Sequence, residues 1–307
     1  MIVEILLVLG GLALLVAGGD LLVKGAVGLS LKLGMTPLVV GLTVVAFGTS
    51  APELLVSVSA ALQGSSGIAM GNVVGSNTAN VLVILGVTAL ISVIVTKGHD
   101  LRESWMMMIG ASVLLIALAM TGQIGRIGGV ILLLAMAAVV WRQLSTGQAE
   151  GDEIGGRTAG AGWARILIWL GLGLVLLPVG ANLLVGGATE IARAFGISET
   201  VIGLTLVAVG TSLPEMAASV ASALKGRSDM ALGNVVGSNI FNILGILGIT
   251  TLIAPLPVPP EMLRLDLWVM LAAALLLWPF LFRAVNVTRA VGAAFIAAYG
   301  VYVWVLL

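Results

Sequence analysis

The 307-residue sequence contains no cysteine, a single histidine and few charged residues, which make up 9% of the chain. Without cysteine there is no disulfide, no thiol nucleophile and no thiolate metal site. Soluble domains usually contain about 25% charged residues, so this shortage of charge, beside 60% hydrophobic residues, excludes an ordinary soluble domain. A net formal charge of zero provides no basic surface for nucleic acid. These absences leave a polytopic membrane protein.

Apolar runs fill most of the chain, and a membrane-spanning helix needs about 20 apolar residues. The N-terminal sequence MIVEILL has no positive region and no cleavage pattern, so it predicts a first span and not a cleaved signal peptide. The sequence predicts ten spans, which cover roughly residues 3–22, 37–62, 70–95, 104–121, 125–143, 165–187, 199–224, 231–254, 265–283 and 287–307.

One polar motif occurs twice within this apolar sequence. Residues 41–62 read GLTVVAFGTSAPELLVSVSAAL, and residues 203–224 read GLTLVAVGTSLPEMAASVASAL. Each copy is followed by a second block, GNVVGSNTAN at 71–80 and GNVVGSNIFN at 233–242. Between 41–90 and 203–252, 31 of 50 residues are identical, always 162 positions apart. The chain therefore divides into two five-span halves, 1–144 and 163–307, joined by a polar, glycine-rich linker at 145–162.

Because five is an odd number, the second half enters the membrane from the side opposite to the first. The predicted fold is an all-α membrane protein with two inverted repeats and broken helices at a midplane site, a design found in many transporters. With ten spans, 11 of the 14 Lys and Arg residues lie on the side of the 145–162 linker and three on the other. The positive-inside rule then predicts a cytoplasmic linker and two extracytoplasmic termini.

A proline breaks each copy of the motif beside a carboxylate. Pro52 lacks an N–H and crowds the carbonyl of Gly48, which must find another partner within the hydrocarbon, for example a cation. Pro214 does the same in the second copy, and the hydroxyl groups of Thr49, Ser50, Thr211 and Ser212 add oxygens beside the breaks.

Glu53 and Glu215 directly follow the two prolines. A carboxylate within a membrane span is costly and marks a candidate functional site. The alternative is a capping box, because Ser50 and Ser212 each precede a glutamate by three residues. Capping alone does not account for a glutamate in the middle of a span, twice, so we assign both glutamates to a site.

The second block places polar residues on one helix face. Asn72, Ser76 and Asn80 are spaced four residues apart, and the second copy repeats this spacing in Asn234, Ser238 and Asn242. The alternative is helix packing through the small residues of Gly71-x-x-x-Gly75 and Gly233-x-x-x-Gly237. Both roles are compatible, because glycines can bring the helices together while amides and hydroxyls line the site.

These residues supply carboxylate, hydroxyl, amide and carbonyl oxygens, with no Lys, Arg, His or Cys among them. Oxygen ligands suit Ca²⁺, which takes 6–8 of them, or several Na⁺ ions. Zinc normally requires His or Cys, and an anion would require cationic residues. The sequence therefore predicts a cation site of formal charge near minus two.

GTSAPE and GTSLPE, each followed by GNVVGSN, resemble the α-repeats of the Ca²⁺/cation antiporter superfamily, the sodium/calcium exchangers. The resemblance covers both halves, and the ten-span length matches the minimal prokaryotic members. It implies a transporter of the prokaryotic plasma membrane that exports Ca²⁺ as Na⁺ enters, by alternating access, without a cofactor and with the monomer sufficient for transport. The transported ions and the lipid bilayer are then its partners.

The resemblance also implies a role for each site residue. Glu53 and Glu215 would bind Ca²⁺ together with Thr49 and Thr211. The Na⁺ sites and the lining of the site would use Ala46, Ser50, Ser76 and Asn80 from the first half and Ala208, Ser212, Ser238 and Asn242 from the second. Asn72 and Asn234 would form the wall of the site.

Many family members carry aspartate where this chain has Asn242, and in the potassium-dependent relatives that aspartate is linked to K⁺ use. The amide predicts that this protein does not need K⁺.

Three other functions are compatible with parts of the pattern. An H⁺/Ca²⁺ or other divalent-cation antiporter would use the same two carboxylates. A cation channel would also use carboxylates and carbonyls, but an internal inverted duplication favours a transporter. A hydrolase with Ser50 or Ser212 as nucleophile lacks a nearby His or Lys to activate it, so we expect no enzyme activity.

Overall fold

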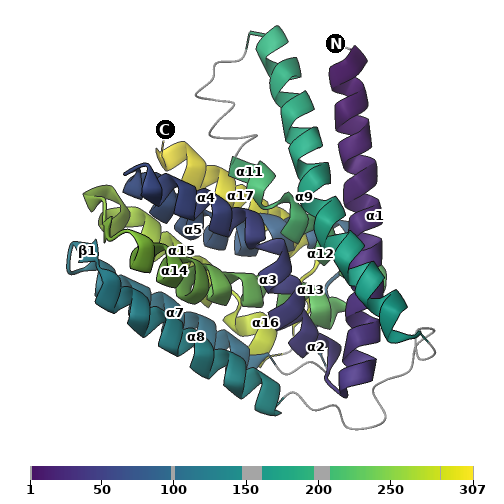
Figure 1. Ribbon diagram of the computed structural model, residues 1–307, viewed down its shortest axis with the longest axis horizontal. Helices are drawn as coiled ribbons and strands as arrows, with labels where there is room; N and C mark the ends of the chain where they lie inside the picture. The colour runs from purple at the N-terminus through teal and green to yellow at the C-terminus, as the bar shows by residue number, and fades with distance from the viewer. Residues whose placement is uncertain (1, 98–100, 147–160, 197–207, 284, 307) are drawn as a thin grey trace.

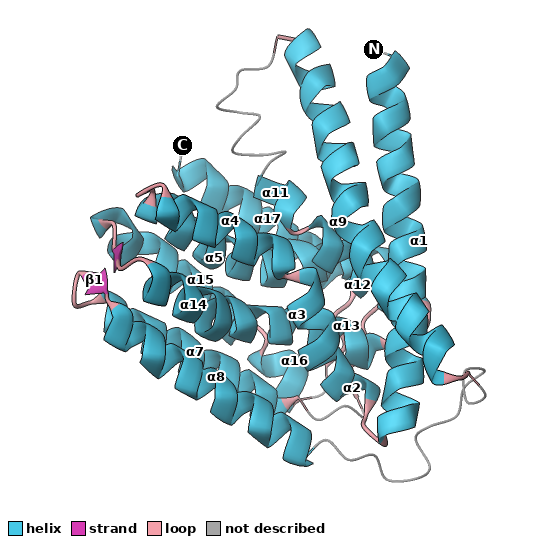
Figure 2. Cartoon of the chain, viewed as in Figure 1, coloured by secondary structure: helices cyan, strands magenta, loops and turns pink. Residues whose placement is uncertain are grey.

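The computed structural model describes residues 2–97, 101–146, 161–196, 208–283 and 285–306, and this part of the chain is almost entirely helical (Figures 1 and 2). In the first half, α1 spans Ile2–Leu33, and α2 (Pro37–Val40), η1 (Gly41–Val45), α3 (Ala46–Thr49) and α4 (Ala51–Leu62) follow as one bent segment. Next come α5 (Ser66–Ala79), η2 (Asn80–Ile84), α6 (Leu85–Ile91), α7 (Arg102–Ala119), β1 (Gln123–Ile124) and α8 (Arg126–Thr146). The segments labelled η are π-helical.

The second half repeats the order of the helices, but its strand comes before the helices equivalent to α7 and not after them. Its elements are α9 (Trp163–Ala194), α11 (Ala208–Thr211), α12 (Leu213–Leu224), α13 (Ser228–Ile240), η4 (Phe241–Ile246), α14 (Leu247–Ile253), β2 (Leu256–Pro257), η5 (Met262–Asp266), α15 (Leu267–Leu275), α16 (Trp278–Phe282) and α17 (Arg289–Leu306).

Eight helices in the described part of the chain are long and apolar enough to cross a membrane, and the bent pair 37–49 and 51–62 makes a ninth. Of the predicted seventh span, 199–224, only residues 208–224 are described, and the 145–162 linker lies almost wholly outside the described residues. The predicted first and sixth spans, 3–22 and 165–187, are too short. The corresponding helices α1 and α9 each have 32 residues. The residues beyond the expected end of the first span remain helical, and Lys24 among them forms an ion pair with Asp20, one turn earlier in α1.

Short backbone contacts sort the loops onto two faces. On one face β1 pairs with β2 in an antiparallel register, which joins the loop after α7 to the loop after α14. On the other face Ile94 pairs with Val287, and the hydroxyl of Ser228 accepts a hydrogen bond from the N–H of Val95. This grouping of the loops is consistent with ten spans.

Helices α1 and α9 lie side by side as an antiparallel pair set against the other helices (Figure 1). Their contact is lined by glycines spaced seven residues apart, at 11, 18 and 25 on α1 and at 173, 180 and 187 on α9. A Cβ added to Gly11 would lie 2.6 Å from the carbonyl oxygen of Gly180, and one added to Gly173 would lie 2.7 Å from the amide nitrogen of Leu22. Only glycine permits this approach, because any side chain would meet the partner backbone.

The most deeply buried spans are 66–91 and 228–253, which are 72% and 78% buried, whereas the α1 span is 22% buried. These two central spans carry the duplicated GNVVGSN blocks. Gly233 and Gly237 on α13 lie directly against the backbone of Leu38 and Leu42, so the predicted small-residue packing is present in the second copy. The residues equivalent to Leu38 and Leu42 in the second half, 200 and 204, lie outside the described residues.

Candidate cation site

Both copies of the proline motif break their helix where the sequence predicts. In the first half α3 ends at Thr49 and α4 begins at Ala51, with a bend of 44° between the segments. In the second half α11 ends at Thr211 and α12 begins at Leu213. Neither Ser50 nor Ser212 makes a side-chain cap to the helix that it precedes. The capping-box alternative is therefore wrong, and both hydroxyl groups remain available for other contacts.

Glu53 and Glu215 are both buried, with 1% of each side chain exposed. The hydroxyl of Ser50 donates a hydrogen bond of 2.9 Å to Oε1 of Glu215 and so connects the two halves. Because Ser50 lies in the turn that leads to Glu53, this bond brings the two carboxylate-bearing breaks into one site. Two carboxylates thus lie in the interior of the molecule, where only a cation or a proton can neutralise them.

The second-block asparagines contact the helices that carry the glutamates. Asn234 donates from Nδ2 to the Glu215 carbonyl oxygen at 3.1 Å and to Ser219 Oγ at 3.0 Å. Asn72 makes the same pair of contacts in the first half, to the Glu53 carbonyl oxygen at 3.1 Å and to Ser57 Oγ at 2.9 Å. Both side chains therefore hold the helix that carries the glutamate, and Asn234 Oδ1 also accepts a bond of 3.4 Å from Thr49 Oγ1.

Several buried oxygens at this site have no hydrogen-bond partner within the described part of the chain. A buried polar atom without a partner calls for a specific explanation, such as an ion. The atoms without a partner belong to six of the predicted residues, and they are Glu53 Oε2, Glu215 Oε2, Asn80 Oδ1, Asn242 Oδ1, Ser212 Oγ and Ser238 Oγ. All are oxygens, which is the chemistry that Na⁺ and Ca²⁺ require.

The remaining predicted residues lie on the same elements. Ala46 and Thr49 are buried on α3, and Ser76 is buried on α5 with 6% of its side chain exposed. Thr211 ends α11, and Ala208 is the first described residue of that helix. Asn80 begins the π-helical segment η2, and Asn242 lies in η4, so each asparagine sits at a widened turn of the kind that often marks functional sites.

Two asparagines at the centre of the molecule were not predicted. Asn77 and Asn239 are buried, with 1% and 2% of their side chains exposed, and each contacts an asparagine of the other half. The prediction rested on a spacing of four residues, which includes residues 72, 76 and 80 but not residue 77. The available signal was the repetition of the GSN sequence itself at 75–77 and 237–239.

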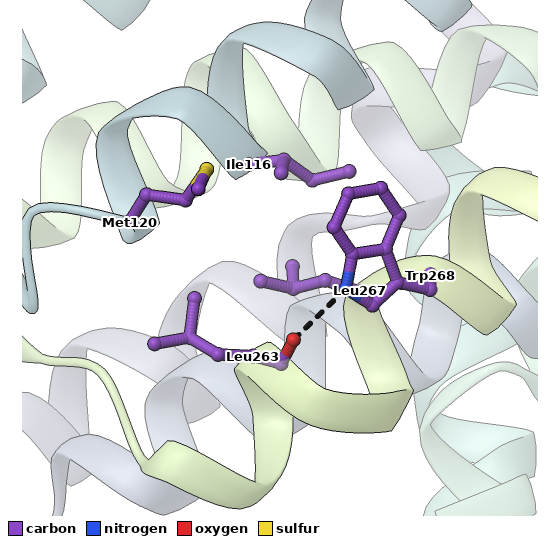
Figure 3. A pocket seen from close by; sticks show the side chains of 5 residues that line it. All are labelled: Ile116, Met120, Leu263, Leu267 and Trp268. Carbon is purple, nitrogen blue, oxygen red and sulfur yellow. Dashed lines mark hydrogen bonds between the residues drawn. The ribbon is translucent and has the colours of Figure 1, made fainter.

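The pocket in Figure 3 lies elsewhere. Its volume is about 190 Å³, and its lining is apolar, with Ile116 on α7 and Met120 directly after α7 opposite Leu263, Leu267 and Trp268. None of these residues belongs to the candidate site.

The fold is that of an integral membrane protein, and its candidate cation site is paired and rich in buried oxygens. The family model described as "Sodium/calcium exchanger protein" matches the chain twice, at residues 3–145 and 165–307. The chain therefore belongs to the sodium/calcium exchanger family, a family of antiporters and not of enzymes.

Individual relatives match over nearly the whole length. The putative antiporter CaxA of Alkalimonas amylolytica is 41% identical, over 90% of this chain and 89% of the relative. The sodium/calcium exchanger MaX1 of Methanosarcina acetivorans is 35% identical, over 99% of this chain and 98% of the relative. Among solved structures, the sodium-calcium exchanger NCX_Mj soaked with zero Na⁺ and Ca²⁺ matches with a TM-score of 0.87 and 33% identity, over 100% of this chain and 99% of that one. The chain is thus a cation/Ca²⁺ antiporter with the exchanger fold.

Proposed function

We propose that this protein exchanges Na⁺ for Ca²⁺ across the prokaryotic plasma membrane and exports Ca²⁺ at the expense of the Na⁺ gradient. The observation that carries the proposal is the set of buried oxygens without partners around Glu53 and Glu215. Two carboxylates give the site a charge of minus two, which one Ca²⁺ neutralises. The surrounding neutral oxygens then complete the coordination shell.

In this proposal Ca²⁺ is bound by the carboxylates of Glu53 and Glu215 with oxygens of Thr49 and Thr211. Na⁺ ions use the same carboxylates together with Ala46, Ser50 and Ser76 from the first half. From the second half they use Ala208, Ser212 and Ser238, and Asn80 and Asn242 lie at the centre. Because both ion sets need the same two carboxylates, full occupancy by one excludes the other, and this competition couples the two fluxes.

Access to the site alternates between the two sides of the membrane. We assign residues 1–144 and 163–307 to two inverted repeats, the 145–162 linker to the cytoplasm and both termini to the outside. Two observations support this topology. The loops pair with one another in two groups. The linker side carries 11 of the 14 cationic residues, which is typical of the cytoplasmic side. One chain contains both half-sites, so a monomer is sufficient for transport.

The second candidate is H⁺/Ca²⁺ exchange, since two buried carboxylates can bind protons in place of Na⁺. The deciding experiment is ⁴⁵Ca²⁺ uptake into proteoliposomes loaded with Na⁺ and diluted into Na⁺-free buffer, beside a matched pH-gradient arm. Uptake driven by Na⁺ and insensitive to the pH gradient supports our proposal. Uptake driven only by the pH gradient identifies the protein as an H⁺/Ca²⁺ exchanger. A third outcome, Ca²⁺ flux that does not depend on counterflow and does not saturate, identifies a channel.

Asn242 adds a condition to this experiment. An amide at this position keeps an oxygen at the site but removes a potential charge, so we propose that exchange proceeds without K⁺. Omitting K⁺ from both sides of the membrane should leave the Na⁺-driven uptake unchanged, and uptake that stops without K⁺ contradicts the proposal.

A further inference from the structure

The four asparagines at the centre of the molecule form one hydrogen-bonded network that crosses between the halves. Asn77 donates from Nδ2 to the carbonyl oxygen of Asn239 at 3.2 Å, and Asn239 donates from Nδ2 to the carbonyl oxygen of Asn77, also at 3.2 Å. Each amide also donates to a methionine sulfur, at 3.7 Å to Met270 and at 3.6 Å to Met108. The two methionines are counterparts in the repeats, so the network has the same form on both sides.

These contacts fix which way the amides of Asn77 and Asn239 point. A backbone carbonyl can only accept a hydrogen bond, so the end of each amide that faces it must be the NH₂ group. The oxygen of each side chain is therefore directed to its other contact. Asn80 donates to Asn239 Oδ1 at 2.9 Å, and Asn242 donates to Asn77 Oδ1 at 3.0 Å.

The orientation is transmitted to the residues at the cation site. Because Asn80 and Asn242 must present NH₂ to an oxygen, their own oxygens face away from the network. Those two oxygens, Asn80 Oδ1 and Asn242 Oδ1, are buried without a partner in the described structure. The reverse orientation would place an NH₂ group at the site, and its positive end would repel a cation.

We propose that Asn77 and Asn239 are positioning residues, which hold the amides of Asn242 and Asn80 with the oxygen toward the transported cation. Each repeat thus orients the amide ligand of the other repeat. The inference rests on the proposed cation site but not on the identity of the driving ion. Partners that orient a metal ligand typically contribute about 10–100-fold to metal affinity, and this is the effect expected here.

The test is a double-mutant cycle on cation binding by the purified protein in detergent, without a gradient. Dissociation constants for Na⁺ and for Ca²⁺ are obtained from the dependence of the melting temperature on cation concentration. The proteins compared are the wild type, Asn80→Ala, Asn239→Ala and the double variant. We expect each single variant to bind Na⁺ about 10–100-fold more weakly. The double variant should bind no more weakly than Asn80→Ala, because Asn239 acts only through Asn80.

Additive losses in the double variant, or wild-type affinity in Asn239→Ala, would overturn the inference, since a residue that merely packs the core changes stability without this coupling. The mirror cycle with Asn77→Ala and Asn242→Ala repeats the test independently if Asn239→Ala does not fold. A wild type without any cation-dependent stabilisation would count against the proposed function itself. Wild-type binding combined with an additive cycle would reject only the positioning role.

Discussion

Glu53 and Glu215 have the same local sequence but different contacts. Ser50 donates to Glu215, whereas the equivalent hydroxyl, that of Ser212, is buried without a partner in the described structure. Within the described part of the chain, neither carboxylate forms an ion pair. Each buried charge without a counter-ion costs several kcal/mol, so, at a pH where both carboxylates are ionised, the protein without cations stores unfavourable electrostatic energy at this site.

This energy leads to a prediction about stability at the residue scale. Replacing one carboxylate, as in Glu215→Gln or Glu53→Gln, removes a buried charge and should raise the melting temperature in cation-free buffer. The same variants should lose stabilisation by Ca²⁺, which in the wild type amounts to about 2.7 kcal/mol at a Ca²⁺ concentration 100 times the dissociation constant. Thermal unfolding in detergent measures both effects. Glu261→Gln, at an exposed position, is the control, and Ca²⁺ stabilisation retained by both site variants would refute the assignment.

At the scale of elements, the pair formed by α1 and α9 depends on its glycines. Gly11 lies against the backbone of α9, whereas the neighbouring Gly10 has no described atom within 4 Å of an added Cβ. The two positions therefore differ in packing but not in helix propensity.

This contrast predicts opposite effects of one methyl group. Gly11→Ala should destabilise the protein by about 1–3 kcal/mol, because α1 and α9 must move apart. Gly10→Ala should stabilise it by roughly 0.5–1 kcal/mol, because alanine favours the helix. The melting temperatures of the two variants in detergent test this prediction. Shifts of the same sign and size in both variants would show that the close contact is not needed.

The sequence predicts much of the helical order for physical reasons. The duplicated motif predicts the positions of both proline breaks and both buried glutamates. A proline and a carboxylate within one membrane span are stable only where the helix is broken and the carboxylate faces the protein interior. The sequence does not reveal that α1 continues beyond residue 22, because one partner of Asp20, Lys225, lies far away in the chain. It also does not show that Asn77 reaches Asn242, since that contact depends on how the halves pack. Local patterns thus predict the elements, and contacts between the halves complete the site.

At the scale of the whole molecule, the two halves are not packed identically. Helix α1 covers α12, where a Cβ on Gly19 would lie 2.9 Å from the carbonyl oxygen of Ala217. The residue equivalent to Ala217 in the first half is Leu55 on α4, which is 69% exposed. In an inverted-repeat transporter, the opposite access state would exchange these two environments.

An ion pair joins the two halves in this structure. Asp20 on α1 pairs with Lys24 at 2.6 Å and with Lys225, at the end of α12, at 2.7 Å. Lys225 also donates to the backbone oxygen of Asp20 at 2.7 Å. The counterparts of Asp20 and Lys225 in the other half are Asn182 and Gln63, which carry no charge. The pair between Asp20 and Lys225 therefore stabilises the observed arrangement and not its mirror state.

Lys225→Gln, which introduces the residue type of the counterpart position, should shift the population away from this arrangement. A partly exposed ion pair contributes about 1 kcal/mol or less, so the shift should be at most roughly fivefold. Distances between spin labels on α1 and α12, measured by pulsed electron paramagnetic resonance, report the two populations. Lys32→Gln, an exposed lysine in the last turn of α1, is the charge-matched control. An unchanged distribution in Lys225→Gln would show that the pairs do not bias access.

The central claim is that Na⁺ and Ca²⁺ share one site built on Glu53 and Glu215. The most direct measurement is equilibrium ⁴⁵Ca²⁺ binding to the purified protein as the Na⁺ concentration is raised. Na⁺ replaces choline in the buffer, so that the ionic strength stays constant. We predict that Na⁺ displaces Ca²⁺ completely and steeply, with a Hill coefficient above one, because several Na⁺ ions replace one Ca²⁺. Ca²⁺ binding that persists at saturating Na⁺ would contradict the account.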